Sequence, residues 1–277
     1  LQERIKAEGA NSPADVMLMV DVGEINAAAD AGITQPIRSA AVDKAVPVQL
    51  RGPDNSWVTL TKRARIVVVS KDRVQQDAIT YDELADPKWK GKFCIRAGQH
   101  PYNNAFFAAY LTRNGAEKTE AYLKALKANV ARKPGGGDRD VARDILSGQC
   151  DIALINTYYI GLMSQAKNEQ KAWFDAIKPL TTTFPGGGTH VNVSAAAIAK
   201  NAPNKDNAVK LIEYMLSEKA QTLYADGNFE FPVNPDVKEG AALKLLGKIT
   251  PDTTPLGDIA RNRKAAADLV DKVGFDN

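Results

Sequence analysis

Runs rich in apolar residues alternate along the chain with segments in which apolar residues recur at helical spacing. The apolar runs predict buried strands at 14–21, 63–70, 92–98, 151–156 and 190–200. The spacing predicts helices at 103–114, 119–129, 139–147 and 206–226. Because strands and helices alternate, we predict an α/β fold with largely parallel sheets.

Two long strand-forming runs, at 63–70 and 190–199, bracket the middle of the chain. A length of 277 residues is more than one compact core usually needs, so we expect two lobes. We predict one lobe from residues 1–66 plus 192–277 and a second from residues 67–191, joined by crossover strands. Ligands in such architectures bind in the cleft between lobes, at the carboxyl ends of strands.

Composition narrows the possible functions. Lys and Arg number 36 against 33 Asp and Glu, and the net charge of +3 comes without a basic block interleaved with aromatics, so no nucleic-acid binding is expected. No apolar run reaches the 18 residues of a membrane span. The chain has two His and two Cys against eight Tyr, which excludes a zinc finger, a His-rich site or an iron–sulfur cluster.

Sequence motifs of enzymes are missing. There is no GxGxxG after a strand, no GxxxxGK[ST], no HExxH and no GxSxG. The glycine triplets Gly135–Gly137 and Gly186–Gly188 are typical of loops, although their amides could cradle an anion. His100 and His190 are typical of surface or capping residues. None of these patterns indicates an enzyme active site.

A pair of tyrosines, Tyr158 and Tyr159, stands where the buried strand 151–156 runs into a predicted helix. At such a turn both hydroxyl groups could face one cleft, and the helix N-terminus favours an anionic group such as a phenolate. Because a tyrosine pKa is normally near 10, two phenolates at neutral pH require a strong local cation, such as a trivalent hard metal. A packed aromatic pair is the alternative.

A third tyrosine, Tyr102, follows another predicted strand end, and Arg96 lies just before it, where a guanidinium could hold an oxyanion. Three phenolates and an anion would give trivalent iron an oxygen-rich shell. Cys94 and Cys150 are 56 residues apart, too far for a CxxC motif. They are either two buried free thiols or one structural disulfide of an oxidising compartment.

These features resemble the periplasmic ferric-ion-binding proteins, the substrate-binding components of bacterial iron ABC importers. The similarity extends over essentially the whole chain and includes SPADVMLMVD, TYDELADPKWKGKFCIR, LSGQCDIALINTYYIG, GGGTHVNVSAAAIAKNAPN and GNFEFPVNPDV. The NTYY element with a third tyrosine 56 residues earlier is its most specific part.

The resemblance implies a type II periplasmic-binding-protein fold that holds Fe(III) through Tyr102, Tyr158 and Tyr159. It also implies a synergistic anion of the carbonate or bicarbonate type near Arg96, and a disulfide between Cys94 and Cys150. The expected protein is a periplasmic monomer that delivers ferric ion to an inner-membrane ABC permease. Relative to the family, the strand and most of the helix that open the fold are expected to be absent from this chain.

Two alternatives stay open at this point. One is the same scaffold carrying another small ligand, such as a polyamine, thiamine, a phosphonate or sulfate, although a sulfate binder would need no paired phenolates. The other is a transferase, because type II lobes also occur in porphobilinogen deaminase. A transferase would need a positioned nucleophile or base, for which two paired cysteines and two histidines offer little.

Overall fold

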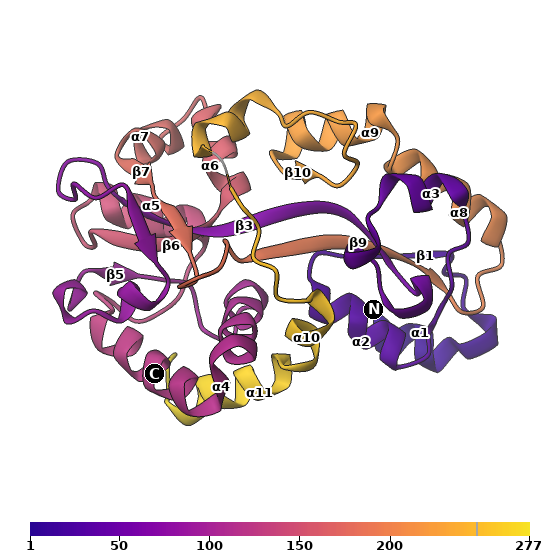
Figure 1. Cartoon of the computed structure of the whole chain (residues 1–277), viewed down its shortest axis with the longest axis horizontal. Helices are drawn as coiled ribbons and strands as arrows, with labels where there is room; N and C mark the ends of the chain where they lie inside the picture. The colour runs from indigo at the N-terminus through magenta and orange to yellow at the C-terminus, as the bar shows by residue number, and fades with distance from the viewer. Residues whose placement is uncertain (248) are drawn as a thin grey trace. The chain divides into compact units, whose positions relative to one another are not determined.

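A computed structural model describes residues 1–247 and 249–277, which form two compact units (Figure 1). Unit 1 comprises Leu1–Lys62, Asn192–Gly240 and Pro255–Arg261. Unit 2 comprises Arg63–Val191, Ala241–Thr254 and Asn262–Asn277. The strands β3 (Val58–Ser70) and β9 (Val191–Ala199) carry the chain from one unit into the other. Among the described residues, no helix is long and apolar enough to cross a membrane.

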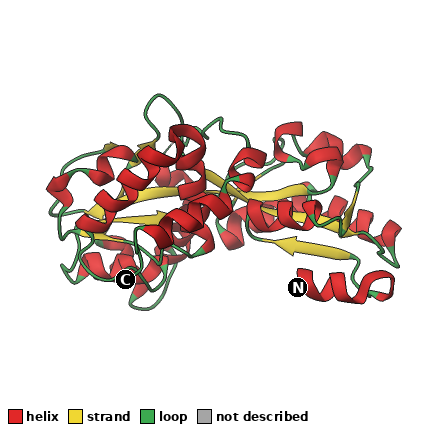
Figure 2. Ribbon diagram, turned by 90° about the horizontal axis from the view of Figure 1, so that it is seen from below, coloured by secondary structure: helices red, strands yellow, loops and turns green. Residues whose placement is uncertain are grey.

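Unit 1 is a sheet covered by short helices (Figure 2). Its strands are β1 (Val16–Met19), β2 (Thr34–Gln35), β10 (Phe231–Pro232), the first part of β3 and most of β9. Its helices are α1 (Gln2–Glu8), α2 (Val22–Asp30), α3 (Ala40–Ala45), α8 (Lys205–Met215), α9 (Glu218–Leu223) and α10 (Leu256–Arg261). Short 3₁₀ turns span Gly9–Asn11, Val48–Leu50 and Pro53–Asn55, and a π turn spans Tyr224–Asn228.

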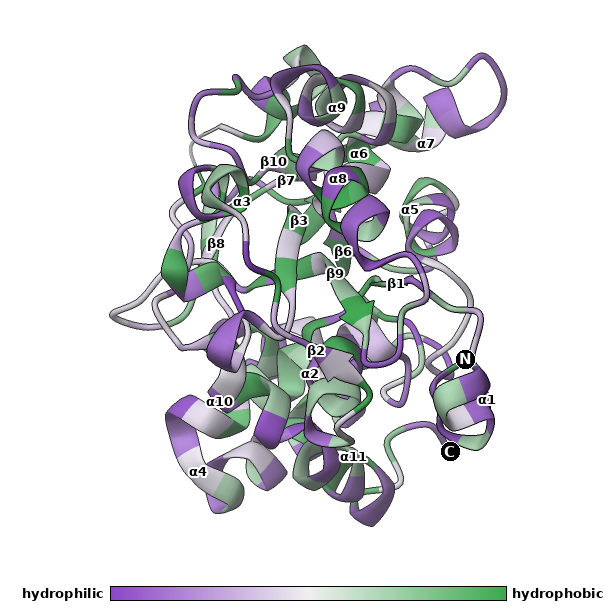
Figure 3. Ribbon diagram, turned by 90° about the vertical axis from the view of Figure 1, so that its right-hand side faces the viewer, coloured by the Kyte–Doolittle hydropathy of each residue, from purple (hydrophilic) through white to green (hydrophobic). Residues whose placement is uncertain are grey.

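The core of unit 1 forms where β3 and β9 face α8. Val58 of β3, Ile198 of β9 and Ile212 of α8 are buried in one cluster. Figure 3 shows β9 as a hydrophobic strand and α8 as a helix with both hydrophilic and hydrophobic residues. This is the pattern of a covered strand and an amphipathic helix, as the apolar spacing predicts.

Unit 2 carries the longest helix of the described residues, α4 (Pro101–Asn129), which is interrupted at Gly115, where φ is 80°. The interruption separates the two helices predicted for this region. The further helices are α5 (Asp138–Leu146), α6 (Thr157–Ser164), α7 (Gln170–Asp175) and α11 (Arg263–Lys272). The strands besides β3 are β4 (Ala78–Thr80), β5 (Phe93–Cys94), β6 (Ile152–Asn156), β7 (Ile177–Pro179) and β8 (Thr181–Thr183). Short 3₁₀ turns span Asp82–Ala85, Pro87–Trp89 and Ala241–Leu246.

The prediction of largely parallel sheets is wrong. β1 and β2 pair antiparallel with β9, and β3 pairs antiparallel with β6, β7 and β10. β5 with β6 and β4 with β8 pair in parallel. The reason is that β3 and β9 run between units, so each joins the local strands in the opposite direction instead of returning through a helical crossover.

The C-terminal segment also differs from the expected division of the chain. The sequence assigned all of 192–277 to the first lobe, whereas Ala241–Thr254 and Asn262–Asn277 belong to unit 2. α11 lies along α4 (Figure 1), and the Lys127 side chain donates to Gly274 O at 2.6 Å. Periodicity shows that a segment is an amphipathic helix, but it does not show which core the helix covers.

Two predicted elements are shorter in the structure. The strand expected at 92–98 pairs only over Phe93–Cys94, and the residues after it form a loop that leads to α4. The helix expected at 206–226 ends at Met215, and α9 begins after Ser217, whose hydroxyl caps Ala220 N at 3.3 Å. A serine competes for backbone hydrogen bonds, so it favours the start of a new helix over the continuation of the old one.

Candidate metal centre

Tyr158 and Tyr159 lie in the first turn of α6, which begins directly after β6. All of β6 is buried, and Thr157 Oγ1 accepts a hydrogen bond from Ala64 N at 3.2 Å, which ties the start of α6 to β3. The two tyrosine ring centroids are 4.2 Å apart, and the rings are tilted by 36°. The change from strand to helix therefore brings consecutive tyrosines together, whereas a continuous strand would send them to opposite faces.

Tyr102 lies in the first turn of α4, where His100 closes the helix N-terminus. His100 Nδ1 accepts from Tyr102 N at 3.2 Å, and Pro101 occupies the first helical position, where no N–H is needed. Tyr158 Oη donates to Tyr102 Oη at 3.0 Å. The structure thus gathers the three predicted tyrosines into one half-buried cluster in unit 2, across 56 residues of sequence.

The surroundings of Tyr158 oppose its ionisation when no cation is bound. Burial raises the pKa of Tyr158 well above its usual value near 10, and the hydroxyl groups of Tyr102 and Tyr159 raise it further. The phenol is therefore neutral at pH 7, and a phenolate forms there only if a cation replaces the proton. Tyr102 and Tyr158 stand in the first turns of α4 and α6, where a helix carries partial positive charge.

Arg96 follows β5 and lies beside Tyr102. Its guanidinium lies 5.1 Å from the centre of the Tyr102 ring, with Nη2 2.7 Å from His100 Nε2 and Nη1 3.5 Å from Asp138 Oδ1. Burial and the charge of Arg96 lower the His100 pKa to about 4, so its ring is neutral. A neutral imidazole accepts at one nitrogen only, so His100 accepts either from Arg96 Nη2 or from Tyr102 N, according to its tautomer.

The guanidinium of Arg96 keeps unused hydrogen-bonding capacity at Nε. Its Nε is buried and has no hydrogen-bond partner among the residues that the structure describes. Two further arginines, which sequence reasoning missed, also face the cluster: Arg63 lies 5.8 Å from the Tyr102 ring centre, and Arg139 lies 5.8 Å from that of Tyr159. They come from β3 and α5, and nothing in the tyrosine motif points to them. The site combines phenol oxygens with cationic side chains that would attract an anion.

The other predicted polar features take no part in the cluster. Gly135 N donates to Ile95 O at 3.1 Å, and Gly137 N donates to Asp140 Oδ2 at 2.7 Å. In the second glycine loop, Gly188 N donates to Asp252 Oδ1 at 3.1 Å. These amides form hydrogen bonds within the protein and are not available to bind an anion. His190 is buried against Phe106, with ring centroids 5.8 Å apart, and is neither a surface nor a capping residue.

The disulfide between Cys94 and Cys150 is present, with the two Cα atoms 5.9 Å apart. Cys94 ends β5 and Cys150 precedes β6, and these strands pair in parallel with Cys94 opposite Ala153. The pairing implied by the resemblance is therefore confirmed. The bond joins the strand that leads to Arg96 to the strand that leads to the tyrosine pair.

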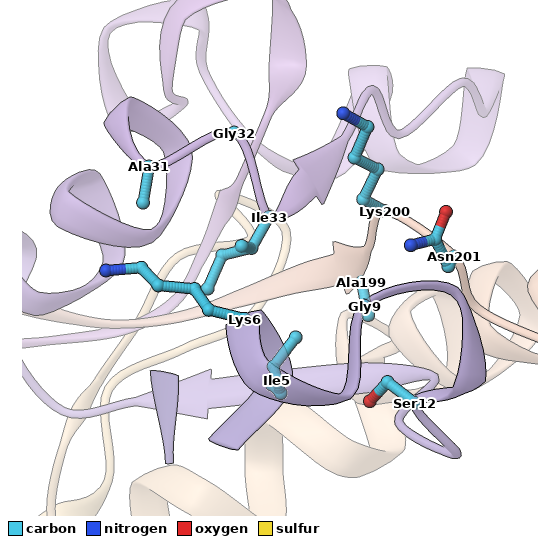
Figure 4. Close-up of a pocket in the computed structure, with 10 residues that line it drawn as sticks. All are labelled: Ile5, Lys6, Gly9, Ser12, Ala31, Gly32, Ile33, Ala199, Lys200 and Asn201. Atoms are coloured by element: carbon cyan, nitrogen blue, oxygen red, sulfur yellow. The ribbon is translucent and has the colours of Figure 1, made fainter. Parts of the chain in front are cut away.

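A cavity of about 430 Å³ lies elsewhere, in unit 1, and Figure 4 shows its lining. Lys6 of α1 and Lys200 after β9 border it, together with Ser12 and Asn201. Since it offers two ammonium groups and no carboxylate or phenol, its chemistry does not suit a metal ion. Among the described residues there is also no group of three or more His, Cys, Asp or Glu side chains arranged to hold a metal.

Comparison with known proteins gives consistent matches over the full chain. The model of a family described as bacterial extracellular solute-binding protein matches residues 1–222. The iron uptake protein A1 of Synechocystis sp. is 40% identical over 277 residues, which cover 99% of this chain and 77% of that protein.

Solved structures give the same result. The Bordetella ferric binding protein superposes with a TM-score of 0.94 and 54% identity, covering 100% of this chain and 88% of that one. A Trichodesmium protein solved in complex with iron and citrate ligands has a TM-score of 0.92 and 38% identity, covering 99% and 87%. These relatives are solute-binding proteins rather than enzymes.

Proposed function

Since this chain belongs to the bacterial extracellular solute-binding proteins, we propose that it binds ferric iron in the periplasm for uptake into the cell. The predicted likeness to ferric-ion-binding proteins and the type II fold are confirmed by the matches along the whole chain. The names of the relatives support ferric ion as the cargo. The same function requires an ABC permease in the inner membrane to receive the ion, and we propose that the protein works as a monomer.

The ligands we propose for the ion are the phenolate oxygens of Tyr102, Tyr158 and Tyr159. The observation that carries this proposal is the 3.0 Å contact between the Tyr158 and Tyr102 hydroxyl groups, with the Tyr159 ring against Tyr158. Hydroxyl oxygens so close can contact one cation once they lose their protons. Fe(III) is a hard ion that prefers anionic oxygen, and its charge offsets the effect of burial that keeps Tyr158 protonated.

A synergistic anion would complete the coordination of the ion, and we propose that Arg96 holds it. The partnerless Nε of Arg96 and the nearby guanidinium groups of Arg63 and Arg139 support an anion of the carbonate or bicarbonate type, or a similar oxyanion. An anion placed here would contact a guanidinium on one side and the metal on the other.

A titration with ferric citrate tests the proposal. We expect a purple-to-red charge-transfer band from iron-bound phenolate, and we expect the double variant Tyr158→Phe with Tyr159→Phe to lose it. The matched control is Tyr214→Phe, because Tyr214 is an exposed tyrosine of α8 in unit 1 and its loss should leave the band unchanged. Absence of a band from the unmutated chain would overturn the proposal and favour another small ligand on the same scaffold.

A further inference from the structure

We infer that Arg65, a buried residue of β3, is the positioning residue that sets the distance between the two halves of the tyrosine cluster. This inference rests on the proposed function. Arg65 touches none of the three tyrosine side chains in the described contacts, and it is only 2% exposed. Its side chain instead contacts the segments in which Tyr102 and Tyr158 stand.

Every N–H of the Arg65 guanidinium has an acceptor. Nε and Nη2 donate to Asn103 Oδ1 at 3.0 and 2.7 Å, and Nη2 also donates to Leu154 O at 3.4 Å. Nη1 donates to Asp138 Oδ2 at 3.0 Å and to Asn156 Oδ1 at 2.9 Å. The guanidinium thus makes five hydrogen bonds. Because it is planar and rigid, these hydrogen bonds fix the positions of their acceptors.

The acceptors lie next to the proposed metal ligands. Asn103 directly follows Tyr102, and Asn156 stands two residues before Tyr158. Asn103 Nδ2 donates to Arg96 O and Ala97 O, both at 2.9 Å, so the same amide holds the loop that carries the proposed anion-binding residue. One guanidinium therefore holds the two tyrosine-bearing helix starts and, through Asn103, the Arg96 loop.

Asp138 completes the arrangement from α5. Its carboxylate is fully buried, pairs with Arg65, and accepts from Asn156 N at 2.7 Å. It supplies the negative charge that a buried guanidinium requires and holds the backbone at the point where β6 ends. The ion pair is thus part of the support for the Tyr158 segment as well as a structural contact in the core.

Lysine at position 65 would keep the charge and lose the planar fork, so it could not hold Asn103 and Asn156 at once. Residues that orient metal ligands typically change affinity by about 10–100-fold when mutated. We expect Arg65→Lys to weaken ferric binding by about that factor and to shift the maximum of the charge-transfer band. A residue that only supports folding would leave the band maximum unchanged in the folded protein.

The control is Arg113→Lys, because Arg113 forms an ion pair with Asp252 at 2.8 Å in the same unit, and Asp252 stands in none of the tyrosine or Arg96 segments. Ferric affinity is measured by competition with citrate, together with the visible spectrum and the circular dichroism of each variant. We expect wild-type affinity and spectrum for Arg113→Lys. If Arg65→Lys folds and also binds with wild-type affinity and spectrum, the inference is overturned.

Asn103→Ala is the second test if Arg65→Lys does not fold, since it keeps the ion pair with Asp138 and removes the amide that joins Arg65 to the start of α4 and to the Arg96 loop. We expect it to weaken binding about 10–100-fold in the wild-type background and to have a smaller effect in Tyr102→Phe, because part of its effect passes through Tyr102 and part through the Arg96 loop. Wild-type affinity in Asn103→Ala would overturn the inference. A wild-type chain without a band overturns the proposed function, whereas a band that these variants do not change overturns this inference alone.

Discussion

A buried histidine in the core of unit 2, His190, makes the stability of the fold depend on pH. His190 is buried between the charges of Arg63, Arg65 and Asp252, and its backbone N–H donates to Tyr81 Oη at 3.0 Å. Burial, followed by the charge of Arg65, lowers its pKa from 6.5 to about 3. The folded protein holds a neutral imidazole that the unfolded chain would protonate in weak acid.

This difference predicts a loss of stability on acidification. Because folding lowers the pKa of His190, the free energy of unfolding is unaffected by this residue's titration above about pH 6.5. It decreases as the pH falls from there toward 3, because the unfolded chain binds the proton and the folded protein does not. Between pH 7 and pH 5 the loss is about 2 kcal/mol. In urea unfolding at both pH values, His190→Gln should lose less stability on acidification than the wild type by about this amount. An equal loss in both proteins would contradict the assignment.

Among the elements, β5 and β6 determine where the proposed ligands stand. They pair in parallel over Phe93–Cys94 and Ile152–Ala153, and the disulfide closes a loop of 56 residues between them. The five buried residues of β6 lead directly into α6, so the position of the tyrosine pair follows from where the strand ends. The positions of the strand ends, rather than the glycine loops, therefore determine where the proposed ligands lie.

Removal of the disulfide should destabilise the fold without abolishing the site. Loss of a cross-link across a loop of this length costs about 4 kcal/mol in the chain-entropy model. We expect the double variant Cys94→Ala with Cys150→Ala to unfold at lower urea concentration than the oxidised wild type. Addition of a reductant under denaturing conditions should lower the wild-type midpoint toward that of the variant, while the variant itself should not respond.

At the scale of the whole molecule, the chain divides into two units, and all the proposed ligands belong to unit 2. A ligand that binds only the folded protein stabilises it by RT ln(1 + [L]/Kd), where [L] is the free ligand concentration. Ferric ion should therefore raise the melting temperature, by an amount that corresponds to about 4 kcal/mol at a free concentration one thousand times Kd. The triple variant Tyr102→Phe, Tyr158→Phe and Tyr159→Phe should show no such rise, and a rise of equal size there would contradict the proposed ligands.

Local sequence was enough to predict the main strands, the break near residue 115, the tyrosine pair at a strand end and the relationship to ferric-binding proteins. Each of these depends on neighbours within one or two turns of the chain, or on a motif. The sequence did not reveal that Arg65 joins Asn103 to Asn156, that Arg63 and Arg139 face the rings, or that β3 and β9 make the sheets largely antiparallel.

The sequence by itself determined which residues could serve as ligands, where a strand ends and the next helix begins, and which two cysteines were available to pair. Only the tertiary structure decided that the Tyr102 hydroxyl meets the Tyr158 hydroxyl, that the C-terminal helix covers α4, and that one buried guanidinium supports both helix starts. The physical reason is that periodicity reports on contacts within an element. Contacts between distant segments depend on which apolar surfaces are buried against one another. They also depend on which polar groups become buried with them and must then form hydrogen bonds with each other.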